Sequence, residues 1–133
     1  MSPKPQGTIV LVDDDRDFLE LYRRVLESRG YATACFSDPQ TALDAMGKSR
    51  PDLVISDLMM KELDSGFSLA RAVKSNPRLA LVPVIIVTAV GSQKGFDFRP
   101  RSPEDLAAMN ADAFFDKPVS PDALVAKVEE LLK

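Results

Sequence analysis

The sequence predicts an α/β domain in which a parallel sheet is covered by helices on both faces. Three features of its 133 residues support this. Short β-branched apolar segments alternate with helical segments five times, two helices open with a capping residue followed by proline, and the strands end in polar residues. Such alternation indicates right-handed βαβ units, and their parallel strands are buried on both faces.

The strands are predicted where apolar residues follow one another within four to eight positions, as in TIVLV and PVIIV. A run of this kind is typical of a strand that is buried on both faces. Five strands are expected, over Thr8–Val12, Tyr31–Cys35, Asp52–Ser56, Pro83–Val87 and Asp112–Asp116.

The helices are predicted from apolar spacing and from capping residues. Phe18, Tyr22, Val25 and Leu26 follow the i, i+4, i+7, i+8 pattern of one helix face, and Gly30 is expected to end that helix. The other helices are expected from Asp38–Pro39 to Gly47, over Gly66–Ser75, over about Pro103–Met109 with Ser102 and Asp105 as a capping box, and from Ser120–Pro121 onward.

The composition indicates one domain over residues 8–133, preceded by a flexible tail over residues 1–7. The chain has no histidine, which excludes a Ser-His-Asp triad and His-ligated zinc. A net charge of −3 does not favour nucleic acid or a membrane as the main partner. Cys35 is the single cysteine, and the first residues lack the apolar stretch of a signal peptide, so we expect a cytoplasmic protein.

Polar residues stand at the ends of four predicted strands. Asp13 and Asp14 follow the first strand, Asp57 the third, Thr88 the fourth and Lys117 the fifth. The carboxyl ends of parallel strands lie on one edge, where ligands bind. Each residue alone has an ordinary structural explanation, such as capping the next helix. Their shared position predicts that they meet in one site.

The residue types in this expected site indicate phosphoryl chemistry. Clustered carboxylates repel one another, and Mg²⁺, which prefers oxygen ligands, relieves that repulsion. A carboxylate can attack phosphorus to give an aspartyl phosphate. Lysine and threonine side chains can then hold the phosphoryl oxygens.

Four segments, IVLVDDD, LVISDLMM, VIIVTA and ADAFFDKPVS, resemble the receiver domains of two-component response regulators, and the likeness covers nearly all of residues 8–132. The resemblance implies a flavodoxin-like (βα)5 fold with strand order 2-1-3-4-5. It also implies a phosphoacceptor switch that receives its phosphoryl group from a sensor histidine kinase or a phosphotransfer protein, and that is not otherwise an enzyme.

The resemblance further implies a role for each matched residue. Asp57 is the expected phosphoacceptor. The remaining expected roles are Mg²⁺ binding by Asp13, Asp14, Asp57 and the backbone carbonyl of Met59, phosphoryl contacts by Thr88 and Lys117, and switching by Thr88 and Phe114.

Three departures from the family pattern are expected to matter. Lys61 stands where the family usually has proline, and Ser65 is inserted before the following glycine. Met59 and Val90 are apolar at the positions that tune dephosphorylation, which predicts slow loss of phosphate. The segment Gly91–Arg101 is an insertion, either a longer loop or a partner-recognition segment.

Two alternatives remain open from the residues. Asp13 and Asp15 also resemble the nucleophile motif of haloacid dehalogenase-type phosphatases, although that leaves Asp57 without a role. The second alternative is a degenerate receiver that acts without phosphorylation. We expect a stand-alone receiver that signals by contact with a downstream protein, and a homodimer through the face of the fourth and fifth strands is one possible assembly.

Overall fold

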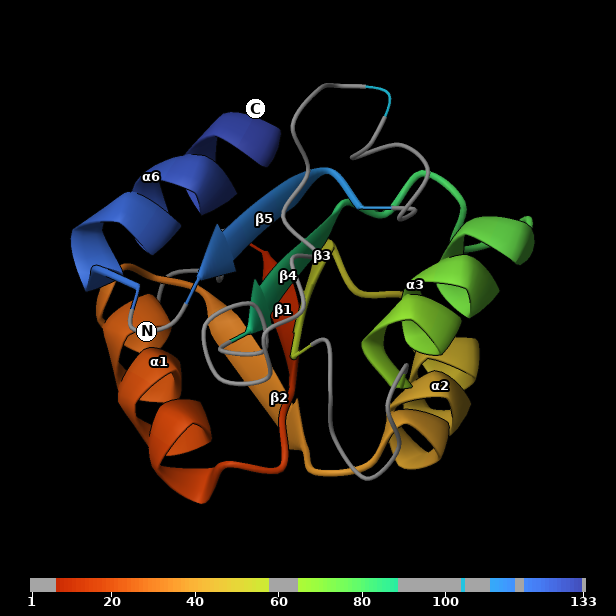
Figure 1. Cartoon of the computed structure of the whole chain (residues 1–133), viewed down its shortest axis with the longest axis horizontal. Coiled ribbons are helices and arrows are strands. Elements are labelled where there is room, and N and C mark those ends of the chain that lie inside the picture. The colour runs from red at the N-terminus through yellow and green to blue at the C-terminus, as the bar shows by residue number, and fades with distance from the viewer. Residues whose placement is uncertain (1–6, 58–64, 89–103, 105–110, 117–118, 133) are drawn as a thin grey trace, which may run out of the picture.

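The structure is a computed structural model that describes residues 7–57, 65–88, 104, 111–116 and 119–132. It has one five-stranded parallel sheet with the order β2-β1-β3-β4-β5, and helices on both sides (Figure 1). This confirms the predicted fold class and strand order. The elements are β1 Thr8–Val12, α1 Arg16–Ser28, β2 Ala32–Phe36, α2 Pro39–Lys48, β3 Leu53–Ser56, α3 Ser65–Ser75, β4 Val84–Thr88, β5 Ala113–Asp116 and α6 Pro121–Leu131.

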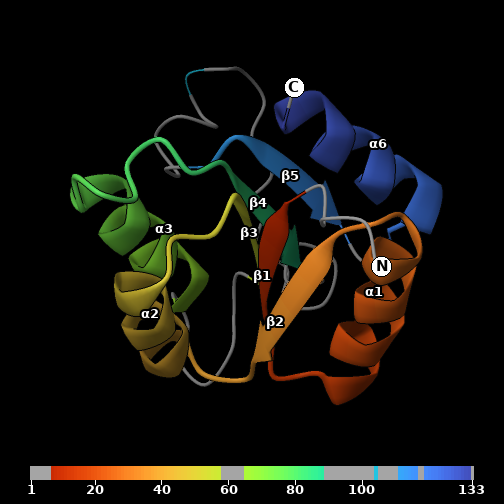
Figure 2. The same cartoon turned by 180° about the vertical axis from the view of Figure 1, so that it is seen from behind.

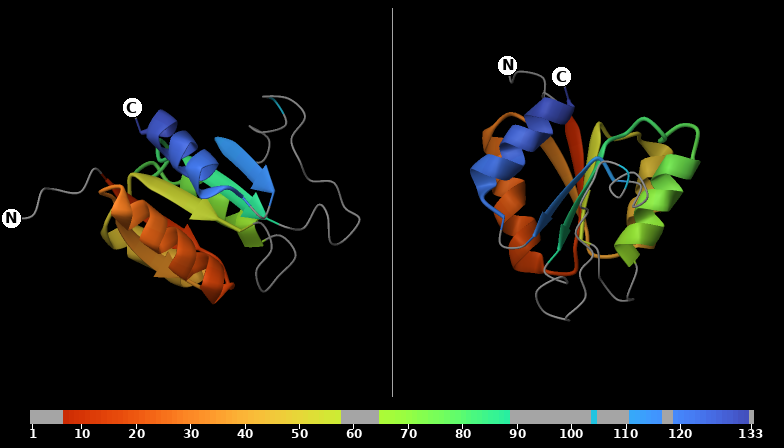
Figure 3. Two further views of the ribbon diagram at one scale, coloured as in Figure 1. Left: turned by 90° about the vertical axis from the view of Figure 1, so that its left-hand side faces the viewer. Right: turned by 45° about the horizontal axis from the view of Figure 1, so that its top comes forward.

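The sheet lies between two pairs of helices. Helices α1 and α6 cover one face, and α2 and α3 cover the other, as Figure 2 and the right-hand view of Figure 3 show. Alternate residues of β1 point to opposite faces, so Ile9 and Leu11 pack with α1 and α6, whereas Val10 and Val12 pack with α2 and α3. Because both faces are buried, the central strands read as continuous apolar runs.

Side chains cap three of the helices at their first turn. Asp15 accepts hydrogen bonds from two backbone N–H groups of α1, at 3.0 and 3.2 Å. Asp38 and Ser120 cap α2 and α6, and each is followed by a proline, as predicted. At the other end of α1, Gly30 has a φ of 95°, which suits glycine after a helix.

Several predicted boundaries differ from the structure by one residue. Strand β2 begins at Ala32 because the N–H of Tyr31 donates to Leu26 in the turn that ends α1. Strand β3 begins at Leu53, because the carboxylate of Asp52 turns back to accept the N–H of Thr8 at 2.7 Å. The prediction that Gly47 ends α2 is wrong. The helix continues through Gly47 to Lys48, and a Cβ at Gly47 would meet nothing within 4 Å.

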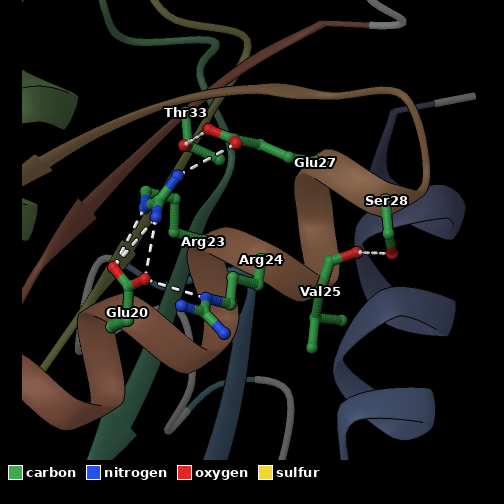
Figure 4. A network of polar contacts seen from close by, with 7 residues as sticks. All are labelled: Glu20, Arg23, Arg24, Val25, Glu27, Ser28 and Thr33. Atoms are coloured by element: carbon green, nitrogen blue, oxygen red, sulfur yellow. Dashed lines mark hydrogen bonds and ion pairs between the residues drawn. The ribbon is translucent and has the colours of Figure 1, made fainter.

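Helix α1 has polar contacts on two sides, with β2 and with the segment before α6 (Pro121–Leu131). On the outer side, Arg23 pairs with Glu20 at 2.8 Å and with Glu27 at 3.1 Å, and Glu27 accepts the hydroxyl of Thr33 on β2 (Figure 4). These ion pairs are solvent-exposed, so they contribute little to stability. On the inner side, the buried hydroxyl of Tyr22 donates to the carbonyl of Val119.

Several predicted segments lie outside the described residues. They are most of the tail over 1–7, the insertion over 91–101, and the helix over 103–109 apart from Glu104. Within the part of the chain that the structure describes, no helix is both long enough and apolar enough to cross a membrane.

Candidate functional site

Three carboxylates meet at the carboxyl edge of the sheet. The N–H of Asp13 donates to Phe36 at 3.0 Å, and the N–H of Asp57 donates to Val12 at 2.9 Å, so both residues continue the ladders of their strands. One carboxylate oxygen each from Asp13, Asp14 and Asp57 lie within 4.8 Å of one another. The topology therefore brings together the acidic residues that the sequence placed in one site.

Burial differs sharply within this acidic cluster of Asp13, Asp14 and Asp57. Asp13 is fully buried, Asp57 is 7% exposed and Asp14 is exposed to solvent. One oxygen of Asp13 accepts the N–H of Asp15 at 2.9 Å, which orients the carboxylate. The site thus places two carboxylates in a poorly solvated environment and leaves a third toward water.

The acidic cluster has the chemistry of a divalent-cation site. Like charges at this separation disfavour joint ionisation, and a bound cation relieves that penalty. The donors are all carboxylate oxygens, the ligand type that hard cations select over softer metals. The cluster can therefore bind a metal ion.

Two of the other predicted site residues, Thr88 and Phe114, lie on β4 and β5. Thr88 is the last residue of β4 and lies in register with Asp116, the last residue of β5, which precedes Lys117 in the sequence. Phe114 lies opposite Ile86 and packs, half-buried, against the core on the α2 and α3 face. The side chain of Thr88, and the whole of Met59 and Lys117, lie outside the described residues.

Ser56 is a feature of the site that sequence reasoning did not single out. Its side chain is fully buried, and its hydroxyl donates to the backbone carbonyl of Asp57 at 2.9 Å. A buried hydroxyl is stable only when it is hydrogen-bonded. The signal was available in the sequence, because Ser56 is the one polar residue of the strand segment LVIS.

The comparisons with known proteins agree with this geometry. The family model described as "Response regulator receiver domain" matches residues 9–129. The chain belongs to the response regulator receiver domain family.

Individual relatives of this receiver domain support the assignment. It is 33% identical over 126 residues to the transcriptional regulatory protein GltR of Pseudomonas aeruginosa, covering 95% of this chain and 49% of GltR. It is 36% identical over 135 residues to GlrR of Escherichia coli, covering all of this chain and 28% of GlrR. A signal receiver domain of a histidine kinase from Syntrophus aciditrophicus superposes with a TM-score of 0.77 at 32% identity, covering 95% of this chain and 89% of that one.

The chain thus spans about half of GltR and less of GlrR. What it shares with them is a receiver domain of two-component signalling.

The family assignment does not favour either alternative function. In addition, Asp15, the second residue of the phosphatase-like motif, uses its carboxylate to cap α1. Asp57, to which the phosphatase hypothesis gives no role, lies in the acidic cluster beside Asp13.

Proposed function

We propose that this receiver domain is a phosphoacceptor switch in which Asp57 receives the phosphoryl group. The observation that carries the proposal is the position of Asp57, almost buried at the carboxyl edge of the central strand and within the acidic cluster. A carboxylate that is held by its backbone and shielded from water is a suitable nucleophile for phosphorus.

The proposed reaction is a displacement at phosphorus. A carboxylate oxygen of Asp57 forms the new oxygen–phosphorus bond while the bond from phosphorus to the imidazole nitrogen of a phosphohistidine breaks. The imidazole leaves with the electron pair of that bond. Because these 133 residues contain no histidine, the phosphohistidine must lie outside them, and we propose that a histidine kinase or a phosphotransfer protein carries it.

The acidic cluster would hold Mg²⁺ through Asp13, Asp14 and Asp57, with the backbone carbonyl of Met59 as a further ligand. The donor set fits this ion, because it consists of oxygens from a few carboxylates. When bound, Mg²⁺ neutralises the charge that develops on the transferred phosphoryl group. The backbone ladders of Asp13 and Asp57 hold the two buried ligands in place.

Thr88, Lys117 and Phe114 would convert phosphorylation into a conformational signal. We propose that the Lys117 ammonium and the Thr88 hydroxyl contact the phosphoryl oxygens, and that Phe114 repacks when Thr88 moves. The register of Thr88 with Asp116, which precedes Lys117 in the sequence, supports this. The readout would be contact with a downstream protein, and a cytoplasmic location, a homodimer and a role for residues 91–101 remain predictions.

The direct test is phosphorylation by a small acyl phosphate in the presence of Mg²⁺. We expect wild-type protein to take up one phosphoryl group and Asp57→Asn to take up none. Asp44→Asn is the matched control, because Asp44 is an exposed aspartate on α2, and it should behave as wild type. Equal labelling of Asp57→Asn and wild type would overturn the proposal.

The same experiment tests the predicted slow dephosphorylation. After removal of the donor, the phosphorylated protein should keep its label for longer than a variant in which Met59 is replaced by glutamate, because a carboxylate there can orient an attacking water. Equal decay of the two proteins would contradict this expectation.

A further inference from the structure

Tyr22 has a polar contact that its place in the helix pattern does not require. It lies on the inner face of α1, is 4% exposed, and its hydroxyl donates to the backbone carbonyl of Val119. Its ring stacks obliquely on Phe18, with centroids 4.4 Å apart. A phenylalanine would fill the same apolar space, so the hydroxyl contributes a specific hydrogen bond across 97 positions of the chain.

The partner of this bond is close in the chain to Lys117. Val119 follows Lys117 by two residues, so the two Cα atoms are at most about 7 Å apart, whatever the path of the chain. The residues on either side of this short connection are fixed. Asp116 ends the β4–β5 ladder, and Ser120 caps α6 by accepting the N–H of Ala123 at 3.4 Å.

The helix that carries Tyr22 begins at the acidic cluster. Asp15 caps α1, and its N–H donates to the carboxylate of Asp13. The outer face of α1 is attached to β2 through Glu27 and Thr33 (Figure 4). Tyr22 therefore connects a fixed helix, whose capping residue Asp15 bonds Asp13, to Val119, two residues after Lys117 in the sequence.

We propose that Tyr22 is a positioning residue whose hydrogen bond fixes the backbone at Val119, two residues after Lys117 in the sequence, relative to the acidic cluster. The inference rests on the proposed function, in which Lys117 contacts the phosphoryl group. Tyr22 acts through the backbone of Val119 and does not itself touch the phosphoryl group. Loss of its hydroxyl removes the bond, leaves the ring packing intact, and lets the connection between β5 and α6 sample other positions.

The test compares two conservative variants of the only two tyrosines in the chain. Tyr22→Phe removes the hydroxyl that bonds Val119. Tyr31→Phe is the matched control, because Tyr31 is similarly buried, at 5% exposure, but precedes β2 at the opposite edge of the sheet. Thermal unfolding verifies that both variants fold.

The first readout is hydrogen exchange of the peptide that spans residues 116–123, which needs no phosphorylation. We expect exchange about three- to tenfold faster in Tyr22→Phe, the factor that one hydrogen bond typically carries, and no change in Tyr31→Phe. Unchanged exchange in Tyr22→Phe would overturn the proposal regardless of any effect on phosphorylation.

The second readout is the rate of Mg²⁺-dependent phosphorylation by an acyl phosphate. Tyr22→Phe should be about three- to tenfold slower, with unchanged Mg²⁺ affinity of the unphosphorylated protein. In a Lys117→Ala background, Tyr22→Phe should have no further effect on the rate, because the two residues act as one unit.

If Tyr22→Phe slows phosphorylation by the same factor in the wild-type and Lys117→Ala backgrounds, the positioning role is refuted. Failure of Asp57 to become labelled in the wild-type protein would instead refute the proposed function, and the assignment of Tyr22 with it.

Discussion

The two edges of the sheet use acidic residues in different ways. At the amino edge, two carboxylates bond groups of neighbouring segments. Asp112 accepts the ammonium of Lys74 at 2.9 Å and the N–H of Val84 at 2.8 Å, and Asp52 accepts the N–H of Thr8. At the carboxyl edge, three carboxylates lie together within 4.8 Å. The amino-edge carboxylates join neighbouring segments of the fold, whereas the carboxyl edge gathers like charge, whose mutual repulsion a bound cation would relieve.

Mg²⁺ should have the largest effect on the free energy of unfolding, and it should act only through the carboxylates at the carboxyl edge. At a hundredfold excess over its dissociation constant, Mg²⁺ should raise the free energy of unfolding by about 2.7 kcal/mol, as measured by urea unfolding. Asp13→Asn should abolish most of this gain, whereas Asp112→Ala should retain it. Equal stabilisation of wild type and Asp13→Asn would show that the ion binds elsewhere.

Asp112→Ala should have the next largest effect, at the amino edge. It leaves the N–H of Val84 and the ammonium of Lys74 without this acceptor, which should lower the free energy of unfolding by about 1–3 kcal/mol. Asp44→Ala, an exposed position on α2, should stay within about 0.5 kcal/mol of wild type. If both variants have equal stability, the amino-edge carboxylate has no special stabilising role.

Asp57→Asn should reduce the stabilisation by Mg²⁺, because it replaces one of the three carboxylates of the acidic cluster with a neutral amide of similar shape. The gain in the free energy of unfolding on adding Mg²⁺ should be smaller than in wild type. An equal gain in the two proteins would contradict a role for Asp57 in binding the ion.

The smallest predicted effect is the contribution of Tyr31, at the amino edge, to the pH dependence of stability. Burial raises the pKa of Tyr31, and Glu129 raises it further. The folded state therefore keeps this proton at pH values where the unfolded state loses it. The stabilisation is complete below the unfolded pKa and is lost as the pH rises through the folded pKa.

Urea unfolding between pH 8 and 11 should therefore show a falling stability in wild type and a shallower fall in Tyr31→Phe. Burial also raises the pKa of Cys35, which contributes a slope of the same sign, so the fall should not vanish. If stability falls with pH at the same slope in wild type and Tyr31→Phe, the raised pKa of Tyr31 is contradicted.

The alternating pattern of the sequence was sufficient to predict the parallel sheet and the position of the acidic cluster, whereas the strand order was predicted from the resemblance to receiver domains. The sheet and the cluster follow from local apolar runs and from the rule that parallel strands share one functional edge. Gly47 was misread because a glycine in a helical segment signals an end only when the backbone needs a positive φ, and here α2 continues to Lys48.

The contacts that join distant segments were not predictable in this way. Tyr22 reads as one more apolar residue of α1, and nothing local reveals that its hydroxyl reaches Val119. Lys74 and Asp112 are likewise separated by 38 positions and meet only because β4 and β5 are neighbours. Such pairs depend on the packing of side chains in three dimensions, which periodicity does not encode.

The most direct test of the central claim is to locate the phosphoryl group itself. The protein should be incubated with Mg²⁺ and an acyl phosphate, digested, and the modified peptide sequenced by mass spectrometry. We predict a single label on Asp57. A label on Asp13, or none on any residue of the acidic cluster, would contradict the account.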